Sequence, residues 1–141
     1  MSELVTAARQ YLGVRFRHRG RTEQGLDCAG LVWKAYDDLG VPLPDFRLYG
    51  PEPHEDGLVA YTTAALGEPF AVAPVRSEQL AAGDVLVVRF DTEPHHIALV
   101  SDYPTGGLAM LHADGHAGKV IEHRLSDKYL ERITHVYRKP V

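Results

Sequence analysis

The chemistry of this chain centres on Cys28, its single cysteine. It follows Gly25-Leu26-Asp27, a turn segment that leads into an apolar run typical of a helix. With Asp27 as N-cap, the thiol would lie in the first helical turn, where unbonded N–H groups and the helix dipole favour a thiolate. Such a cysteine, with histidines far along the chain, is a candidate nucleophile. The alternative is a small buried residue without chemistry, because unpaired cysteines are often buried.

A nucleophilic cysteine needs a base and a group that orients the base, and two histidines are candidates for these roles. His96 opens an apolar segment that alternates as a strand, and His112 closes the next such segment. A hairpin places the start of one strand beside the end of the next, so we expect the two to be cross-strand neighbours. His96 would be the base and His112 would orient it. Alternation points the adjacent His95 to the opposite face, which favours His96 as the base.

A metal site is the other chemistry that clustered histidines allow, here from His95, His96, His112 and His116. The sequence holds no HExxH motif and no Cys/His spacing typical of zinc ligands. We therefore expect no metal and no organic cofactor.

Composition predicts one globular domain over residues 1–141, with 45% hydrophobic and 24% charged residues. A net charge of −4 gives no reason to expect nucleic acid or an anionic membrane as a partner. A single cysteine excludes an intrachain disulfide. The first residues show no signal peptide, and no apolar stretch reaches membrane-spanning length. We therefore expect synthesis in the cytoplasm without a leader.

Helical patterns come first along the chain and strand patterns follow. Apolar periodicity predicts helices over 2–12, 28–39 and, more weakly, 55–66, with a proline-rich loop over 41–54. The strands are expected at 84–90, 96–101, 108–113, 119–124 and 133–137. Short turns favour antiparallel pairing. The expected fold is α+β, with N-terminal helices packed on a C-terminal antiparallel sheet of about five to six strands.

Five segments in chain order resemble the NlpC/P60 peptidases of the papain-like cysteine peptidase superfamily: 11–13, 25–32, 80–86, 96–100 and 111–113. The resemblance implies the papain-like NlpC/P60 fold and hydrolysis of a peptide bond in bacterial cell-wall (peptidoglycan) stem peptides. The bond is commonly the one between D-glutamate and a diamino acid. It also implies Cys28 as nucleophile, His96 as general base and His112 as the third polar residue.

A narrower resemblance concerns His18, residues 20–21, 43–46 and 49–50, and the closing segment 120–126. These are similar to the subgroup encoded in phage and phage-like tail operons. The resemblance implies a tail-associated enzyme that acts on the host wall, with phage tail proteins as partners.

Two positions depart from the family pattern. Phe16 stands where a tyrosine often helps to stabilise the oxyanion, a contribution of roughly 3 kcal/mol per donor. Either another donor serves, such as the Cys28 backbone N–H, or the enzyme is slow. Ala29 stands where serine is common, which could change the stem-peptide preference.

Three further residues are candidate substrate contacts. The resemblance implies that Asp27 binds the free amine of the substrate, although capping the helix is an equal alternative. His18, with Arg19 and Arg21, forms a basic stretch that could attract stem-peptide carboxylates or be a solvated loop. Tyr49 lies in the proline-rich loop and could line a substrate groove.

Two other functions remain open. One is a structural or assembly protein of a tail with weak or lost activity, which Phe16 and Ala29 favour and the intact Cys28, His96 and His112 oppose. The other is a thiol amidase or acyltransferase on a non-wall substrate, because the same triad would serve it.

Overall fold

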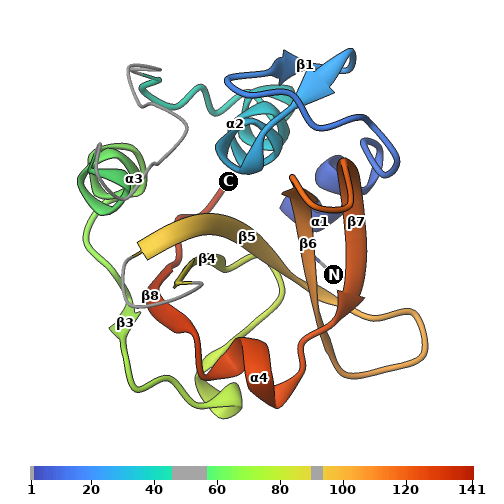
Figure 1. The fold of residues 1–141 in the computed structure, drawn as a ribbon. Coiled ribbons are helices and arrows are strands. Elements are labelled where there is room, and N and C mark those ends of the chain that lie inside the picture. Colours follow the sequence, from blue (N-terminus) through green and yellow to red (C-terminus); the bar gives the residue numbers. More distant parts are fainter. Residues whose placement is uncertain (1, 46–56, 90–93) are drawn as a thin grey trace.

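Helices α1, α2 and α3 lie over one face of an antiparallel sheet in the computed structural model, which describes residues 2–45, 57–89 and 94–141 (Figure 1). The first helix, α1, spans Glu3–Arg9 and begins at Ser2, whose Oγ accepts a hydrogen bond from the Val5 N–H at 3.3 Å. It ends earlier than predicted. The chain turns away so that the Gly13 N–H can donate to the Val120 carbonyl, which leaves Leu12 exposed.

Helix α2 spans Cys28–Asp38 and begins at Asp27, as the sequence predicts. Helix α3 spans Leu58–Leu66 between Gly57 and Gly67, both with positive φ, so its start is later than the predicted one. A single turn, α4, covers Asp127–Leu130, and a 3₁₀ turn covers Ser77–Gln79.

Within the described ranges the main sheet has six strands, and every neighbouring pair is antiparallel. In spatial order they are β3 (Ala71–Val72), β8 (Ile133–Tyr137), β4 (Val85–Arg89), β5 (Pro94–Asp102), β6 (Leu108–Asp114) and β7 (Lys119–Arg124). A separate small hairpin pairs β1 (Arg21–Thr22) with β2 (Gly25–Leu26). The predicted α+β class is confirmed. The prediction missed β1, β2 and β3, which have two residues each and so no alternation to detect.

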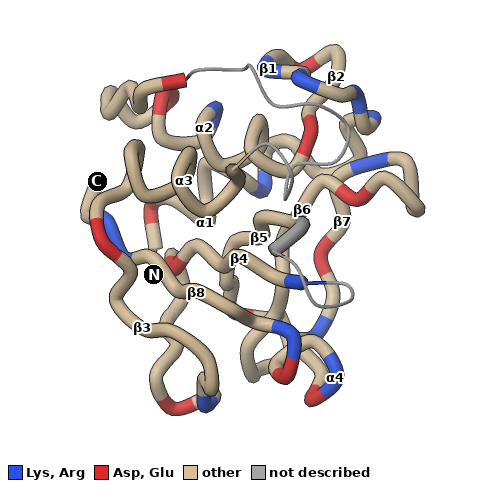
Figure 2. The backbone as a smooth tube through the Cα atoms, turned by 60° about the vertical axis from the view of Figure 1, so that its left-hand side comes forward, with Lys and Arg blue, Asp and Glu red and all other residues tan. Residues whose placement is uncertain are grey.

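Alternation along the strands builds two apolar cores. Ile97, Leu99 and Leu111 face the helices and pack with them. Ala98 and Met110 face the other way, into a second core that α4 partly covers. Figure 2 shows acidic and basic residues interspersed, mainly in turns and at the ends of elements in the part it colours. The two cores that flank the sheet are apolar, so a polar side chain buried there needs a specific partner.

The loop before the second helix is pressed onto that helix. A Cβ atom added at Gly30 would lie only 2.0 Å from the backbone oxygen of Gly20. Only glycine at position 30 allows this approach. The contact fixes the path of the loop that leads into Cys28.

None of the helices within the described ranges combines the length and the apolar character that crossing a membrane requires.

Candidate active site

Cys28 is the first residue of α2, and its side chain is buried, with 8% of the residue exposed. The backbone N–H groups of Ala29 and Ile97 lie near its sulfur and act to lower the pKa of the thiol. Ile97 directly follows His96 in β5. The structure thus brings the start of the cysteine helix against the peptide that joins His96 to Ile97.

The protonation of Cys28 differs from the sequence expectation. Burial raises the pKa of the Cys28 thiol to about 12, and the negative charge of Asp27 acts in the same direction. The two backbone N–H groups and the Arg21 guanidinium oppose the rise without cancelling it. A position in the first helical turn favours a thiolate, but here burial and the capping carboxylate outweigh it. The group at rest is a thiol.

Three histidines lie on neighbouring strands of the sheet, one each on β5, β6 and β7. Leu99 pairs with Leu111, which faces the helices, so the next residue of β6, His112, points to the other face. His96 lies beyond the last β5–β6 pair, where the two strands separate. His123 of β7 pairs with Met110 of the second core and therefore shares that face. The expected pairing of His96 with His112 is present.

Hydrogen bonds join these rings into a row. His96 Nε2 lies 2.7 Å from His112 Nδ1, and His112 Nε2 lies 2.9 Å from His123 Nε2. At the end of the row, His123 Nδ1 lies 2.9 Å from the Arg124 backbone oxygen. Both His96 and His112 are buried. The row therefore connects the candidate base to a backbone carbonyl on the outermost strand.

His112 is held neutral at physiological pH. Burial and, to a smaller degree, the charge of His123 lower its pKa to about 4, against the opposing effect of Asp114. A neutral imidazole donates from one ring nitrogen and accepts at the other. His112 can therefore accept at one side and donate at the other, as an orienting residue must.

Sequence reasoning assigned no role to His123. The sequence feature that could have identified it is its position in the 119–124 strand pattern, which puts it on the same face as residue 121. Recognising the contact also needs the register between β6 and β7, in which His112 is opposite Ile121 and diagonal to His123.

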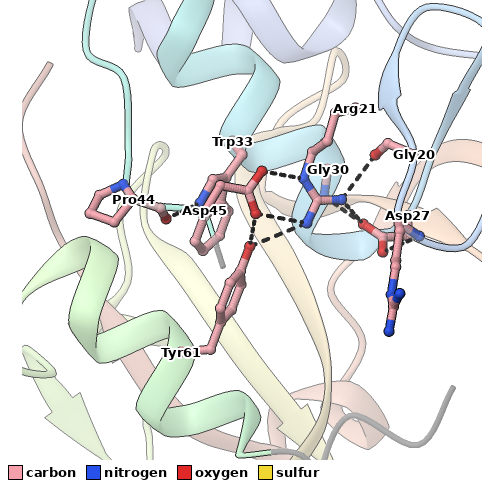
Figure 3. Close-up of polar contacts among 9 residues, drawn as sticks. Gly20, Arg21, Asp27, Gly30, Trp33, Pro44, Asp45 and Tyr61 are labelled. Carbon is pink, nitrogen blue, oxygen red and sulfur yellow. Dashed lines mark hydrogen bonds and ion pairs between the residues drawn. The ribbon is translucent and has the colours of Figure 1, made fainter. Parts of the chain in front are cut away.

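Asp27 caps the helix, as predicted, and both of its oxygens accept further hydrogen bonds. Oδ1 accepts from the Gly30 N–H at 2.7 Å and from Arg21 Nη1 at 2.8 Å. Oδ2 accepts from the Arg19 N–H at 2.9 Å, with Arg19 in the left-handed region at φ 62°. The substrate-binding role of Asp27 stays a prediction, and its charge is already paired with Arg21 (Figure 3).

Arg21 is a structural cation and not part of a solvated basic loop. Its side chain is 11% exposed, and its guanidinium donates from Nε to Asp45 Oδ2 at 2.8 Å as well as to Asp27. Tyr61 of α3 joins the cluster by donating from its hydroxyl to Asp45 Oδ1 at 2.7 Å (Figure 3). The cluster ties α3 and the segment at Asp45 to the loop before Cys28.

Of the other predicted substrate contacts, the structure describes Phe16 and His18. Phe16 is half-buried, its N–H donates to the Gly118 oxygen at 2.8 Å, and its ring borders Gly115 in the turn after β6. His18 is exposed. Tyr49 lies outside the described residues, and so does the His95 side chain.

No group of three or more His, Cys, Asp or Glu side chains in the described part of the chain is arranged to hold a metal ion. The three clustered histidines bond to one another through their ring nitrogens instead. We therefore assign no metal ligand.

The fold and the site define an α+β domain with a buried cysteine at a helix start beside strand histidines. The sequence model of the NlpC/P60 family matches residues 13–139, and the chain belongs to this family. No curated protein matches the sequence.

Solved structures share the fold at low sequence identity. An NlpC/P60 family protein from Bacillus cereus is 21% identical with a TM-score of 0.66, and the match covers 99% of this chain and 40% of that one. The peptidoglycan hydrolase RipB from Mycobacterium tuberculosis is 21% identical with a TM-score of 0.60, covering 99% and 64%. An N-acetylmuramoyl-L-alanine amidase from Bacteroides uniformis is 10% identical with a TM-score of 0.60, covering 96% and 95%. The chain thus spans about two fifths of the first of these proteins.

Proposed function

We propose that this protein is a cysteine hydrolase that cuts a peptide bond in the stem peptides of bacterial peptidoglycan. One observation carries the proposal: the Cys28 thiol lies against the His96–Ile97 peptide, where a hydrogen-bonded pair of histidines begins. Membership of the NlpC/P60 family and the fold shared with a peptidoglycan hydrolase support it.

The proposed reaction is acyl transfer through a thioester. His96 takes the proton of the Cys28 thiol, and the sulfur attacks the scissile carbonyl carbon. The C–N bond then breaks, and the leaving amine takes the proton from His96. Water attacks the thioester with His96 as base, which releases the carboxylic acid and restores the thiol. His112 orients the His96 ring throughout.

The raised pKa of Cys28 shapes the first step. A thiol with a pKa of about 12 is not ionised at rest, so proton transfer to His96 accompanies attack. This arrangement differs from the preformed ion pair of cysteine and histidine that a low pKa would give. Substrate that weakens the effect of the Asp27 charge on the thiol would lower the pKa of Cys28 and so make the proton transfer easier.

We further propose the bond between D-glutamate and the diamino acid as the point of cleavage. The proposal rests on the resemblance to the family, with Asp27, Phe16, His18 and Tyr49 as candidate contacts to the substrate. For Asp27 to bind a free amine, the amine must share or replace the Arg21 contact at 2.8 Å. Exchange of one cation for another keeps the buried carboxylate paired.

The test is digestion of purified peptidoglycan and of a defined L-Ala-D-Glu-diamino-acid peptide by the wild type and Cys28→Ala, with products read by mass spectrometry. We expect fragments with a new amino terminus at the diamino acid from the wild type alone. Cleavage that persists in Cys28→Ala would contradict the proposal. So would the absence of cleavage by a folded wild-type protein, which would favour the structural tail role.

An amidase is the second candidate, favoured by the shared fold of the Bacteroides uniformis enzyme. The same digestion separates the two functions. An amidase that cuts at the sugar would release intact stem peptides with a free L-alanine amine, and the D-Glu–diamino-acid bond would survive.

Association with a phage or phage-like tail, and action from there on the host wall, is a proposal that the sequence resemblance alone supports. It predicts that the protein co-sediments with tail particles from the producing strain, detected by peptide mass spectrometry. Its presence only in the particle-free fraction would contradict tail association and leave the hydrolase proposal intact.

A further inference from the structure

The row of histidines ends at a group that can only accept a hydrogen bond. His123 Nδ1 lies 2.9 Å from the backbone oxygen of Arg124. A carbonyl oxygen carries no proton, so the ring nitrogen must donate. In a neutral imidazole the other nitrogen, Nε2, then carries a lone pair and accepts.

With all three rings neutral, the same reasoning passes along the row. His123 Nε2 accepts, so His112 Nε2 donates across the 2.9 Å contact. His112 Nδ1 therefore accepts, and His96 Nε2 donates across the 2.7 Å contact. A neutral His96 then has its lone pair on Nδ1, the form that a base needs.

We propose that His123 is a positioning residue, which uses the Arg124 carbonyl to set the tautomers of His112 and His96 and so leaves His96 Nδ1 able to take the Cys28 proton. The catalytic meaning of this inference rests on the proposed function. A peptide oxygen is a suitable end for the row because its acceptor role never changes with pH.

Two aromatic rings flank the His123 ring. It meets the His112 ring edge-on at a centroid distance of 5.0 Å and the Tyr129 ring of α4 at 5.1 Å. Burial of His112 also makes the His123 contact important. A buried N–H of His112 without an acceptor would lose a hydrogen bond that water cannot replace.

The pKa of about 4 for His112 agrees with this arrangement, since burial keeps that ring neutral above mildly acidic pH. A neutral His112 must choose one tautomer, and His123 provides the acceptor that selects it. A polar row that is fully satisfied is also rigid, so His96 is held as well as correctly protonated.

The direct test is imidazole ¹⁵N NMR on histidine-labelled protein at pH 7.5. We expect His123 as the Nδ1–H tautomer, and His112 and His96 as Nε2–H tautomers. His123→Gln should preserve the last two, because the glutamine oxygen can accept from His112. His123→Phe keeps a ring but no acceptor, so His112 and His96 should show mixed tautomers.

Hydrolysis by the same proteins gives the functional readout. We expect His123→Phe to lower kcat about tenfold or more with little change in KM, as for other orienting contacts. His123→Gln should recover most of the loss. Tyr129→Leu is the matched control, because it removes the ring packing on His123 but none of the hydrogen bonds, and it should stay close to wild type.

Three results would overturn the inference: an Nδ1–H tautomer on His112 in the wild type, equal loss in His123→Gln and His123→Phe, or equal loss in Tyr129→Leu. If His123→Phe does not fold, the wild-type tautomers and the glutamine variant still decide. If no wall substrate is cut, the NMR result judges the row separately from the proposed function.

Discussion

At the scale of single residues, the chemistry depends on the environments that Cys28 and the histidines share. The cysteine lies where a helix dipole favours its ionised form, yet burial and a neighbouring carboxylate hold it as a thiol. His112 is likewise shifted toward its neutral form by burial. Cys28 and His112 are therefore uncharged at rest. The proposed first step creates a charged pair of Cys28 and His96 only when substrate is present.

This resting state predicts a distinct pH profile for alkylation of Cys28. With a pKa of about 12, the thiolate is about one part in 10⁵ at pH 7. Reaction with iodoacetamide should therefore rise about tenfold per pH unit from pH 6 to 9, because only the thiolate reacts. Urea-unfolded protein, whose thiol is exposed, is the control and should level off near pH 9. A plateau in the folded protein below pH 8 would instead demonstrate a preformed ion pair.

Alanine substitutions should separate the three proposed roles. Cys28→Ala should abolish hydrolysis without unfolding the chain, and His96→Ala should lower kcat by about 10² to 10⁴, the usual contribution of a general base. His112→Ala should cost less, because it orients the base and transfers no proton. His95→Ala is the neighbouring control. Equal losses of kcat in His95→Ala and His96→Ala, measured by steady-state kinetics, would contradict the assignment of His96 as the base.

At the scale of elements, α2 is positioned by the loop that precedes it. Arg21 links Asp27 at the start of the helix to Asp45 and, through Tyr61, to α3. These segments are far apart in the chain, so the cluster holds the start of the cysteine helix in place from several sides. The close contact between Gly20 and Gly30 completes this attachment.

Gly30→Ala tests that attachment, because we expect it to lower the free energy of unfolding, whereas helix propensity alone would raise it. In an exposed helix, alanine would stabilise by about 1 kcal/mol relative to glycine. Here the new Cβ would lie 2.0 Å from the Gly20 oxygen, which is backbone and cannot rotate away. We expect a destabilisation of about 1–3 kcal/mol, as for overpacked sites, measured by urea unfolding.

Gly115→Ala is the control for this substitution, because its Cβ would meet only the Phe16 ring at 3.9 Å. It should change the free energy of unfolding little. A Gly30→Ala protein as stable as the wild type would show that the loop can move away from the helix.

At the scale of the whole molecule, two cores lie on the two faces of one sheet, and the buried His112 belongs to the face opposite the helices. Burying a titratable group ties the stability of the whole fold to its protonation. His112 is the clearest case, with a folded-state pKa of about 4 against 6.5 for an unperturbed histidine.

Stability should therefore fall in acid. Between pH 6.5 and about 4 the unfolded chain binds a proton on His112 that the folded protein rejects, so acid favours unfolding in this window. The full contribution is present above pH 6.5, and by pH 4 up to about 3 kcal/mol is lost. Urea titrations at pH 7.5 and 4.5 measure it. His112→Asn should show a smaller loss, and an identical loss in both proteins would contradict the assignment.

Sequence reasoning predicted much of the architecture because the relevant signals are local. The cap at Asp27, the start of α2 at Cys28 and the strands carrying His96 and His112 all follow from patterns within a few residues. The helix of residues 2–12 was predicted too long, since the contact of Gly13 with Val120 comes from the far end of the chain. The small hairpin and β3 were too short to show a pattern.

By itself, then, the sequence determined the α+β class, the helix start at Cys28 and the pairing of His96 with His112, because capping, alternation and hairpin geometry are properties of short segments. Only the tertiary structure decided that Cys28 rests as a thiol, that Arg21 is structural and that His123 extends the histidine row. Each of these depends on burial or on the register between distant segments, which no local pattern specifies.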